Sequence, residues 1–459
     1  MNKIKSSFRD PSGFLFSDGN ILYRQVNNSY KKEFEHFIES GLYDELVKKE
    51  LLISHEEVDV NSSEPEKLYK IIKPKMINFI SYPYEWSFNQ LKDAALVTIE
   101  IQKIALDYGM TLKDASAYNV QFFNGKAIFI DTLSFELYEE GQIWKGYKQF
   151  CQHFLAPLAL MSHRDIRLNQ LLRIYLDGIP LDLTAELLPM RTRSMFSLLA
   201  HIHTHSKNQK NYEEKNLEIK NKNFSKTKFI GIIESLHSAI QKQNWDLEKT
   251  EWGNYYSDTN YSDTAIQDKK EIISNLIEKN DPKEVWDIGG NIGLFSRIAS
   301  NKGIPTVCFD NDPLAIEKNY LEIKQKNEKN ILPILLDLTN PSTDIGWQNN
   351  ERDSFLKRGP AELVMALALV HHIAISNNVP LELIAEFFSR FTKKLIIEFV
   401  PKSDTQVKRL LATREDVFFE YDKKNFEKQF EKFFNILDQK EIKESERTIY
   451  YMENKISFN

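Results

Sequence analysis

The sequence predicts an α/β protein of two domains, in which the second domain contains a parallel sheet and the first has an α+β arrangement. Three observations lead to this fold class. After residue 245, short apolar runs alternate with amphipathic stretches, as in a parallel sheet covered by helices on both faces. Before residue 206 lies a segment of aromatic-rich strands and helices. Between the two, residues 206–226 are rich in Lys, Asn and Glu and too poor in apolar side chains to order a core.

These observations divide the chain into three parts. We expect an α+β domain over residues 1–205, a polar linker with a lead-in helix over residues 206–245, and a second domain over residues 246–459. The total of 459 residues suits two or three domains, since a domain usually has roughly 100–200 residues.

The composition excludes several classes of protein. The chain has 60 Lys+Arg against 66 Asp+Glu, and this near-neutral balance makes a nucleic-acid partner unlikely as the main ligand. Two cysteines, Cys151 and Cys308, are too few for a disulfide framework and lack metal-site spacing. No apolar run reaches the ~18 residues of a membrane-spanning helix, and the first residues have no signal-like apolar stretch. We therefore expect a cytoplasmic protein without a membrane span.

The first domain begins with a predicted hairpin, in which Asp18-Gly19 joins strands over residues 14–17 and 20–26. An amphipathic helix follows, and the apolar residues of its buried face are Phe34, Phe37, Ile38, Leu42 and Leu46. Residues 71–80 predict a strand and a hinge, and residues 88–106 a long buried helix.

The most specific pattern of the first domain lies between Asp114 and Asp131. Asn124-Gly125 between two apolar runs predicts a hairpin with Asn119 at one end and Asp131 at the other. Asp-x-x-x-x-Asn, a hairpin and a further Asp resemble the catalytic loop of protein-kinase-like folds. The resemblance implies that Asp114 acts as a base and that Asn119 and Asp131 bind Mg²⁺ beside ATP.

The kinase-like pattern is incomplete. Leu112-Lys113 stands before Asp114 in place of His-Arg, Thr132-Leu133 follows Asp131 in place of Phe-Gly, and no glycine-rich loop to cover phosphates is present. Arg24, on the predicted first hairpin, lies near where a kinase has its lysine strand. The alternative is an acceptor-binding domain in which Asp114 and Asn119 only stabilise a loop.

The second domain opens with a strand over residues 284–288 and a glycine-rich turn over residues 289–293, before a helical stretch. Such a turn lets the backbone approach a ligand closely. The next strand, residues 306–309, ends in Asp310, about 20 residues after the glycines, where a doubly wound fold places a carboxylate on ribose hydroxyls. The remaining predicted strands are 331–336, 362–367, 395–397, 433–442 and 447–452.

This domain resembles the class I S-adenosylmethionine-dependent methyltransferases, with a Rossmann-like sheet of seven strands. The resemblance rests on Asp287-x-Gly289-x-Asn291-x-Gly293, on the acidic strand ends and on the late pair of strands. It implies that the turn holds the amino-acid end of S-adenosyl-L-methionine, the carboxylate after the second strand binds the ribose, and the residue after the third strand meets the adenine. The cofactor residues that it assigns are Asp287, Gly289, Gly290, Asn291, Gly293, Asp310, Asn311, Asp337 and Leu338.

Two features bear on the identity of the cofactor. Asn291 stands where the family usually has its middle glycine. A dinucleotide is the rival ligand, but a dehydrogenase would have Gly-x-Gly-x-x-Gly, and Asp287 would repel a pyrophosphate while suiting a cationic amino group. The pattern therefore favours the methyl donor.

The candidate catalytic residues follow the fourth and fifth strands. His371 or His372 would take a proton from a hydroxyl acceptor, or one of them would merely pack at the strand end. Glu398 would orient the acceptor or cap a turn. The segments around residues 368–372 and 398–416 resemble nodulation-type methyltransferases, whose substrates are poorly defined.

These patterns predict a methyltransferase acting on an oxygen of a small-molecule or carbohydrate acceptor. A bifunctional kinase-methyltransferase acting on a glycan is the first alternative, and a non-catalytic protein that binds the cofactor is the second. No metal site is predicted in the methyltransferase domain. The alternating His201, His203 and His205 are read as a polar helix end before the linker, since no fourth ligand is evident.

Overall fold

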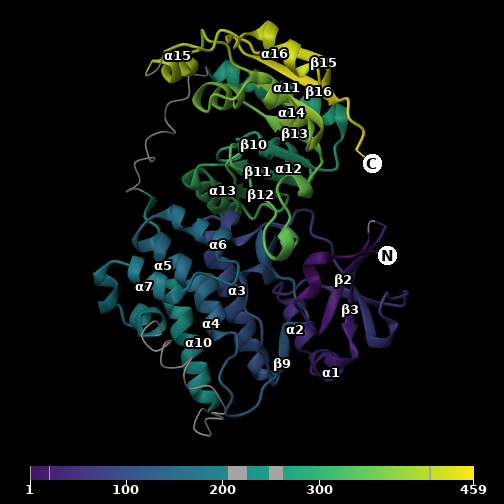
Figure 1. Cartoon of the computed structure of the whole chain (residues 1–459), viewed down its shortest axis with the longest axis vertical. Helices are drawn as coiled ribbons and strands as arrows, with labels where there is room; N and C mark the ends of the chain where they lie inside the picture. Colours follow the sequence, from purple (N-terminus) through teal and green to yellow (C-terminus); the bar gives the residue numbers. More distant parts are fainter. Residues whose placement is uncertain (1, 20, 205–224, 248–261, 413–414, 459) are drawn as a thin grey trace. The chain divides into compact units, whose positions relative to one another are not determined.

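The computed structural model describes the whole chain except residues 1, 20, 205–224, 248–261, 413–414 and 459 (Figure 1). The chain forms two compact units. Unit 1 consists of residues 1–246 together with the short segment 345–352, and unit 2 consists of residues 247–344 and 353–459. Each unit is described by itself.

Unit 1 begins with an antiparallel sheet of five strands in the order β1-β2-β3-β5-β4. Its strands are β1 (Asn2–Lys3), β2 (Gly13–Asp18), β3 (Ile21–Asn27), β4 (His55–Val58) and β5 (Leu68–Pro74). The pairing of β2 with β3 confirms the predicted hairpin. The single helix predicted after it is two helices, α1 (Lys31–Glu39) and α2 (Leu42–Lys48), because Gly41 between them adopts φ +84° and ends the first.

The long buried helix of the prediction is α3 (Phe88–Asp107), which begins where the Ser87 side chain accepts a hydrogen bond from the backbone of Gln90. Strands β6 (Met110–Leu112) and β9 (Phe135–Leu137) then pair with each other, as do β7 (Val120–Phe123) and β8 (Lys126–Phe129). Asn124 and Gly125 join β7 to β8 with positive φ angles of 52° and 76°, so the hairpin is confirmed.

The rest of unit 1 is helical. The helices are α4 (Tyr147–Phe150), α5 (Ala156–His163), α6 (Leu171–Ile174), α7 (Leu181–Leu187), α8 (Phe196–Leu198) and α10 (Lys226–Gln241). The described histidines before the linker are buried and hydrogen-bonded, with His201 Nδ1 2.7 Å from the Tyr147 hydroxyl and His203 Nε2 2.9 Å from Thr192 Oγ1. His205 lies outside the described residues.

The helix α10 corrects the predicted division of the chain. It belongs to unit 1, where it packs along α3 and buries Phe229 against the rings of Tyr138 and Trp144. The ammonium of Lys92 on α3 donates to the carbonyl of Gln243 at 2.7 Å. Residues 226–241 are therefore the last helix of the first unit, not a lead-in to the second, because their apolar face completes that core. Most of the predicted polar linker lies outside the described residues.

Unit 2 has a seven-stranded sheet in the order β12-β11-β10-β13-β14-β16-β15 (Figure 1). Its strands are β10 (Val285–Ile288), β11 (Thr306–Asp310), β12 (Ile331–Leu335), β13 (Ala361–Ala366), β14 (Thr392–Phe399), β15 (Phe434–Glu441) and β16 (Thr448–Asn454). The first five strands are parallel and β16 is antiparallel to both neighbours. All seven strands of the prediction are present, and the sheet is the Rossmann-like one that the resemblance implied.

The helices of unit 2 connect these strands. They are α11 (Asp263–Asn280), α12 (Ser296–Ser300), α13 (Pro313–Lys326), α14 (Leu381–Ser389), α15 (Thr405–Leu411) and α16 (Lys423–Phe430). Among the residues that the structure describes, no helix is both long and apolar enough to cross a membrane.

The register of the sheet determines where a ligand can bind. Asp287 on β10 lies opposite Cys308 on β11 and Met365 on β13. The carboxyl ends of these strands therefore meet at one edge, at the point where the strand order reverses on either side of β10. In open α/β sheets this crevice is the usual ligand site.

Candidate functional site

The glycine turn after β10 is shaped by its backbone. Gly289 and Gly293 have φ angles of 75° and 80°, which glycine adopts without steric cost. The amides of Gly289 and Gly290 both donate to the Phe309 carbonyl, at 2.8 and 3.0 Å, and so tie the turn to β11. A Cβ on Gly290 would lie 2.6 Å from the sulfur of Cys308, so this position admits no side chain without rearrangement.

Asp310 at the end of β11 is held by backbone donors. Its Oδ2 accepts a hydrogen bond from the amide of Asn291 at 2.9 Å, and its Oδ1 accepts one from the amide of Asp312 at 2.9 Å. Burial raises the pKa of Asp310 to about 6, although these amides favour the ionised form. The carboxylate is thus fixed beside the glycine turn, and no cationic side chain among the described residues pairs with it.

Asp287 lies beneath the turn and is buried. Its Oδ2 accepts a hydrogen bond of 2.6 Å from Ser296 Oγ on α12, and burial raises its pKa to about 6. Sequence reasoning missed Ser296, whose hydrogen bond to Asp287 ties α12 to the end of β10. Asp287 therefore packs against the backbone of Gly290 and stabilises the turn from the protein interior.

The other residues assigned to the cofactor by resemblance lie at the same sheet edge. Leu335 of β12 is paired with Asp310, and Asp337 and Leu338 follow directly. Asp337 is exposed and its Oδ1 accepts hydrogen bonds from the backbone and the hydroxyl of Thr339, at 2.8 and 2.6 Å. Asn311 is exposed as well. These side chains are accessible to a ligand, whereas Asp287 is not.

The paired histidines follow β13, close to the glycine turn. Leu369 precedes them, and its side chain would lie 3.2 Å from a Cβ built on Gly289. His371 is buried, its ring lies 4.3 Å from that of His372, and its Nδ1 has no hydrogen-bond partner within the described chain. Burial, and then the positive charges of His372 and Arg447, lower the pKa of His371 to about 3, and burial lowers that of His372 too. The sequence suggested an ordinary histidine pKa, but burial keeps His371 neutral.

Glu398 at the end of β14 is fully buried in a network of charges. Its Oε2 lies 2.6 Å from Lys269 Nζ on α11, and its Oε1 lies 3.5 Å from Arg447 Nη1. Arg447 Nε also donates to Asp404 at 2.7 Å. Two cations neutralise this carboxylate, so Glu398 holds the strand ends together and is not free to take a proton.

The sequence contained a signal for Lys269 that the prediction did not use. Ala265, Ile273 and Ile277 are buried on one face of α11, and Lys269 falls at the same helical spacing. A lysine on an apolar face needs a buried anion. Arg447 carries no comparable pattern, because its partners lie far away in the sequence.

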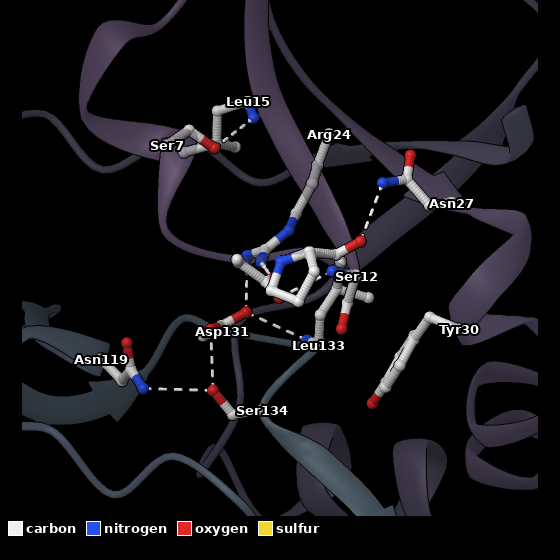
Figure 2. A network of polar contacts seen from close by, with 12 residues as sticks. Ser7, Ser12, Leu15, Arg24, Asn27, Tyr30, Asn119, Asp131, Leu133 and Ser134 are labelled. Atoms are coloured by element: carbon white, nitrogen blue, oxygen red, sulfur yellow. Dashed lines mark hydrogen bonds and ion pairs between the residues drawn. The ribbon is translucent and has the colours of Figure 1, made fainter. Parts of the chain in front are cut away.

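Figure 2 shows the polar network around the predicted kinase-like residues in unit 1. Asp131 Oδ1 lies 2.5 Å from Arg24 Nη1 and accepts from the amide of Leu133 at 3.0 Å. Asp131 Oδ2 accepts from the hydroxyl of Ser134 at 2.7 Å, and Asn119 Nδ2 donates to that hydroxyl at 3.1 Å. The fold therefore brings Asn119 and Asp131 together through Ser134, as the hairpin predicted.

Asp114 lies beside this network. Its Oδ1 accepts from the amide of Ser116 at 3.0 Å. Burial, and then the negative charge of Asp131, raise the pKa of Asp114. Within the described ranges, no three His, Cys, Asp or Glu side chains are grouped so that they could hold a metal ion.

Comparison with known proteins identifies one relative over the whole chain. The nodulation protein NoeA of Rhizobium meliloti (strain 1021) is 34% identical over 464 residues, which cover 98% of this chain and 96% of the relative. No family model matches the chain.

Solved structures show only distant similarity. The bifunctional kinase-methyltransferase WbdD is 17% identical with a TM-score of 0.30, over 42% of this chain and 40% of that one. The N-methyltransferase NodS of Bradyrhizobium japonicum WM9 is 9% identical with a TM-score of 0.32, over 42% and 98%. The magnesium protoporphyrin IX methyltransferase ChlM of Synechocystis PCC 6803, with bound SAH, is 15% identical with a TM-score of 0.31, over 44% and 92%.

Proposed function

The chain belongs to the family of the nodulation protein NoeA, and we propose that it is an S-adenosylmethionine-dependent methyltransferase whose reaction takes place in unit 2. One observation carries this proposal. A glycine turn leaves β10 at the point where the strand order reverses, and its amide at Asn291 fixes the carboxylate of Asp310 at the end of the next strand.

The residues at this edge suit the cofactor. Asp310 is ionised at neutral pH and carries no neutralising side chain, so it would accept hydrogen bonds from the two ribose hydroxyls. Gly289 and Gly290 are partly exposed, so their backbone would approach the amino-acid end of the ligand closely. Asp337 and Leu338 would line the side of the adenine. When bound, the cofactor supplies an electrophilic methyl group on a sulfonium.

Positioning dominates the chemistry that this chain performs. The acceptor oxygen must lie in line with the bond from sulfur to the methyl carbon, and that alignment is the main source of rate. With the cofactor bound, the acceptor oxygen would gain the methyl carbon as the carbon–sulfur bond breaks with its electron pair remaining on sulfur, and the hydroxyl proton would leave to solvent. His371 has a pKa of about 3 and is as buried as Asp287, so it stays neutral beside the site at neutral pH. The less buried His372, whose pKa burial also lowers, would accept a hydrogen bond from the hydroxyl and orient it.

The charges around the candidate catalytic residues favour an uncharged acceptor. His371 is neutral, and Glu398 is already neutralised by Lys269 and Arg447. Neither residue presents a free charge that would bind a charged substrate. We therefore propose a hydroxyl of a small neutral molecule or a carbohydrate as the acceptor.

Titration calorimetry with S-adenosylhomocysteine tests the cofactor assignment. We expect binding by the full chain and a loss of about 100-fold in affinity for Asp310→Ala, since hydrogen bonds to a charged group contribute roughly 1.5–3 kcal/mol each. Asp438→Asn is the matched control, because Asp438 lies on β15, the outermost strand on the side of the sheet away from β11 and β12. Absence of binding, or binding that Asp310→Ala leaves intact, would contradict the proposal.

Turnover separates an enzyme from a protein that only binds the cofactor. Transfer of a labelled methyl group to neutral saccharides or small alcohols is expected, with the label on oxygen. A chain that binds S-adenosylhomocysteine through Asp310 but methylates no acceptor of this class would leave the second alternative, a non-catalytic binding protein.

A further inference from the structure

The kinase-like residues of unit 1 do not fit the metal that their pattern implies. Mg²⁺ requires near-octahedral oxygen ligands at about 2.0–2.1 Å, usually from one or two carboxylates. In a kinase-like site those oxygens would come from Asn119 and Asp131. Here both oxygens of Asp131 are already engaged, Oδ1 by Arg24 and Leu133 and Oδ2 by Ser134.

Arg24 is built into this site. Its side chain is 12% exposed and makes two ion pairs, with Asp131 Oδ1 at 2.5 Å and with Asp10 Oδ2 at 2.7 Å. Figure 2 shows the guanidinium reaching from β3 to Asp131. The planar guanidinium presents several donors in a fixed fork, so one arginine can bridge two carboxylates as a point charge cannot.

The surroundings fix each partner of Arg24. Asp10 Oδ1 accepts from the amide of Ser12 at 2.9 Å, and the hydroxyl of Ser12 accepts from Lys113 Nζ at 2.6 Å. The Lys113 ammonium also lies 4.5 Å from the centre of the Tyr30 ring. Neither carboxylate can turn toward a metal without breaking its ion pair with Arg24 and its hydrogen bond to a backbone amide.

Asn119 is committed to the same network. The nitrogen of its amide donates to Ser134, which in turn donates to Asp131. This chain of hydrogen bonds turns the amide nitrogen of Asn119 toward Ser134 and Asp131. The loop is thereby closed by protein groups, with the cation of Arg24 between the two anions Asp10 and Asp131.

From this geometry we infer that the Arg24 guanidinium takes the place of a divalent cation, so that the kinase-like loop of unit 1 is a metal-independent structure that does not bind Mg²⁺ or Mn²⁺ at Asp131. Unit 1 then performs no magnesium-dependent phosphotransfer, and the bifunctional alternative is disfavoured. The inference concerns unit 1 only and does not depend on the methyltransferase proposal.

The test measures Mn²⁺ binding by the full chain through water-proton relaxation, scored as the part of the binding that Asp131→Asn removes. The wild-type chain should show no such part. Arg24→Gln should create Mn²⁺ binding that depends on Asp131, because Asp10 and Asp131 are then left without their cation. We expect at least a tenfold gain in Mn²⁺ affinity. Adding Asp131→Asn to Arg24→Gln should abolish the gain.

Two control variants isolate the effect of Arg24. Arg167→Gln removes an arginine that pairs with Asp165 on the surface of the same unit, and it should leave Mn²⁺ binding unchanged. Arg24→Lys retains the positive charge and should also prevent metal binding at Asp131. Thermal unfolding of each variant shows that it is folded.

Two results would overturn the inference. One is that the wild-type chain binds Mn²⁺ and that Asp131→Asn removes this binding. This measurement needs no substitution of Arg24, so it remains valid even if the Arg24→Gln variant does not fold. The other is a folded Arg24→Gln chain that gains no Asp131-dependent binding, since Arg24 would then not be the group that takes the cation's place.

Discussion

The two units hold their central carboxylates in different ways. Asp131 in unit 1 is neutralised by the guanidinium of Arg24 at 2.5 Å. Asp310 in unit 2 accepts hydrogen bonds from backbone amides, those of Asn291 and Asp312 among them. Backbone amides orient a carboxylate and leave its charge available to a ligand, whereas a buried cation satisfies that charge within the protein. The difference supports the proposals that Asp310 serves a ligand site in unit 2 and that unit 1 binds no metal at Asp131.

Glu398 extends this comparison, because it lies in unit 2 but is neutralised as Asp131 is. Its partners Lys269 and Arg447 are both buried. Glu398→Gln keeps the volume and removes the carboxylate that neutralises the buried ammonium of Lys269, while Arg447 keeps its pair with Asp404, so we expect a loss of about 3–5 kcal/mol in the free energy of unfolding. Urea unfolding followed by circular dichroism gives this value.

The matched control is Glu386→Gln, which removes an exposed pair with Arg390 on α14 and should cost less than about 0.5 kcal/mol. A loss below about 1 kcal/mol for Glu398→Gln would mean that the two cations find other partners. Glu398 would then not depend on its cations, and the difference in unit 2 between a carboxylate held by cations, Glu398, and one held by amides, Asp310, would not hold.

Asp310→Asn should act in the opposite direction on stability. Burial raises the pKa of Asp310 from 3.8 to about 6. At pH 7.5 the carboxylate is ionised in both states, but ionisation is less favourable in the folded chain than in the unfolded chain, so Asp310 lowers the stability of the fold. A shift of about two pKa units corresponds to an upper limit of about 3 kcal/mol, and losing one acceptor oxygen offsets about 1–2 kcal/mol of it. We expect a net gain of about 1 kcal/mol without ligand, measured by urea unfolding, together with weaker binding of S-adenosylhomocysteine.

The same group predicts a pH dependence with a definite sign. Since the folded pKa is raised, Asp310 favours the folded state below its unfolded pKa, and this contribution is lost as the pH rises through about 6. Ligand binding needs the ionised form, so affinity for S-adenosylhomocysteine should fall toward tenfold per unit as the pH drops from 6 to 5. Asp310→Asn should remove the part of this dependence that Asp310 causes. An unchanged pH profile in that variant would contradict the role of the carboxylate.

The sequence predicted what depends on local pattern. The seven strands of unit 2, the glycine turn and the hairpin between Asn119 and Asp131 were all found, because period and turn residues determine them locally. The break at Gly41 was missed, since the apolar spacing continues across it from Phe37 to Leu42.

What the sequence could not predict depends on residues that are distant along the chain. Lys269 and Glu398 are separated by 129 positions, and Arg24 and Asp131 by more than 100, so no spacing announces either ion pair. The lowered pKa of His371 likewise follows from burial that only the fold creates. The sequence therefore indicated candidate residues from local motifs, but not their distant partners or their charge states.

Asn291 is the smallest test of the contrast between the two units. It stands where the family resemblance implies a glycine, with φ +53°, and its amide is one of the two that orient Asp310. If the backbone alone holds the carboxylate, Asn291→Gly should retain that donor. We expect the free energy of unfolding to change by less than about 1 kcal/mol, because relief of the left-handed conformation offsets the greater entropy of the unfolded glycine chain.

Calorimetry distinguishes the backbone from the side chain at this position. Affinity for S-adenosylhomocysteine should change less than about threefold in Asn291→Gly, since the variant loses only the bond from the Ile292 amide to Asn291 Oδ1. Asn291→Ala is the control, because it also loses that bond but keeps a Cβ at the positive φ, where alanine is disfavoured. A large loss in both variants would mean that the asparagine side chain contributes to the site, and the amide at Asn291 would not be sufficient to prepare Asp310 for its ligand.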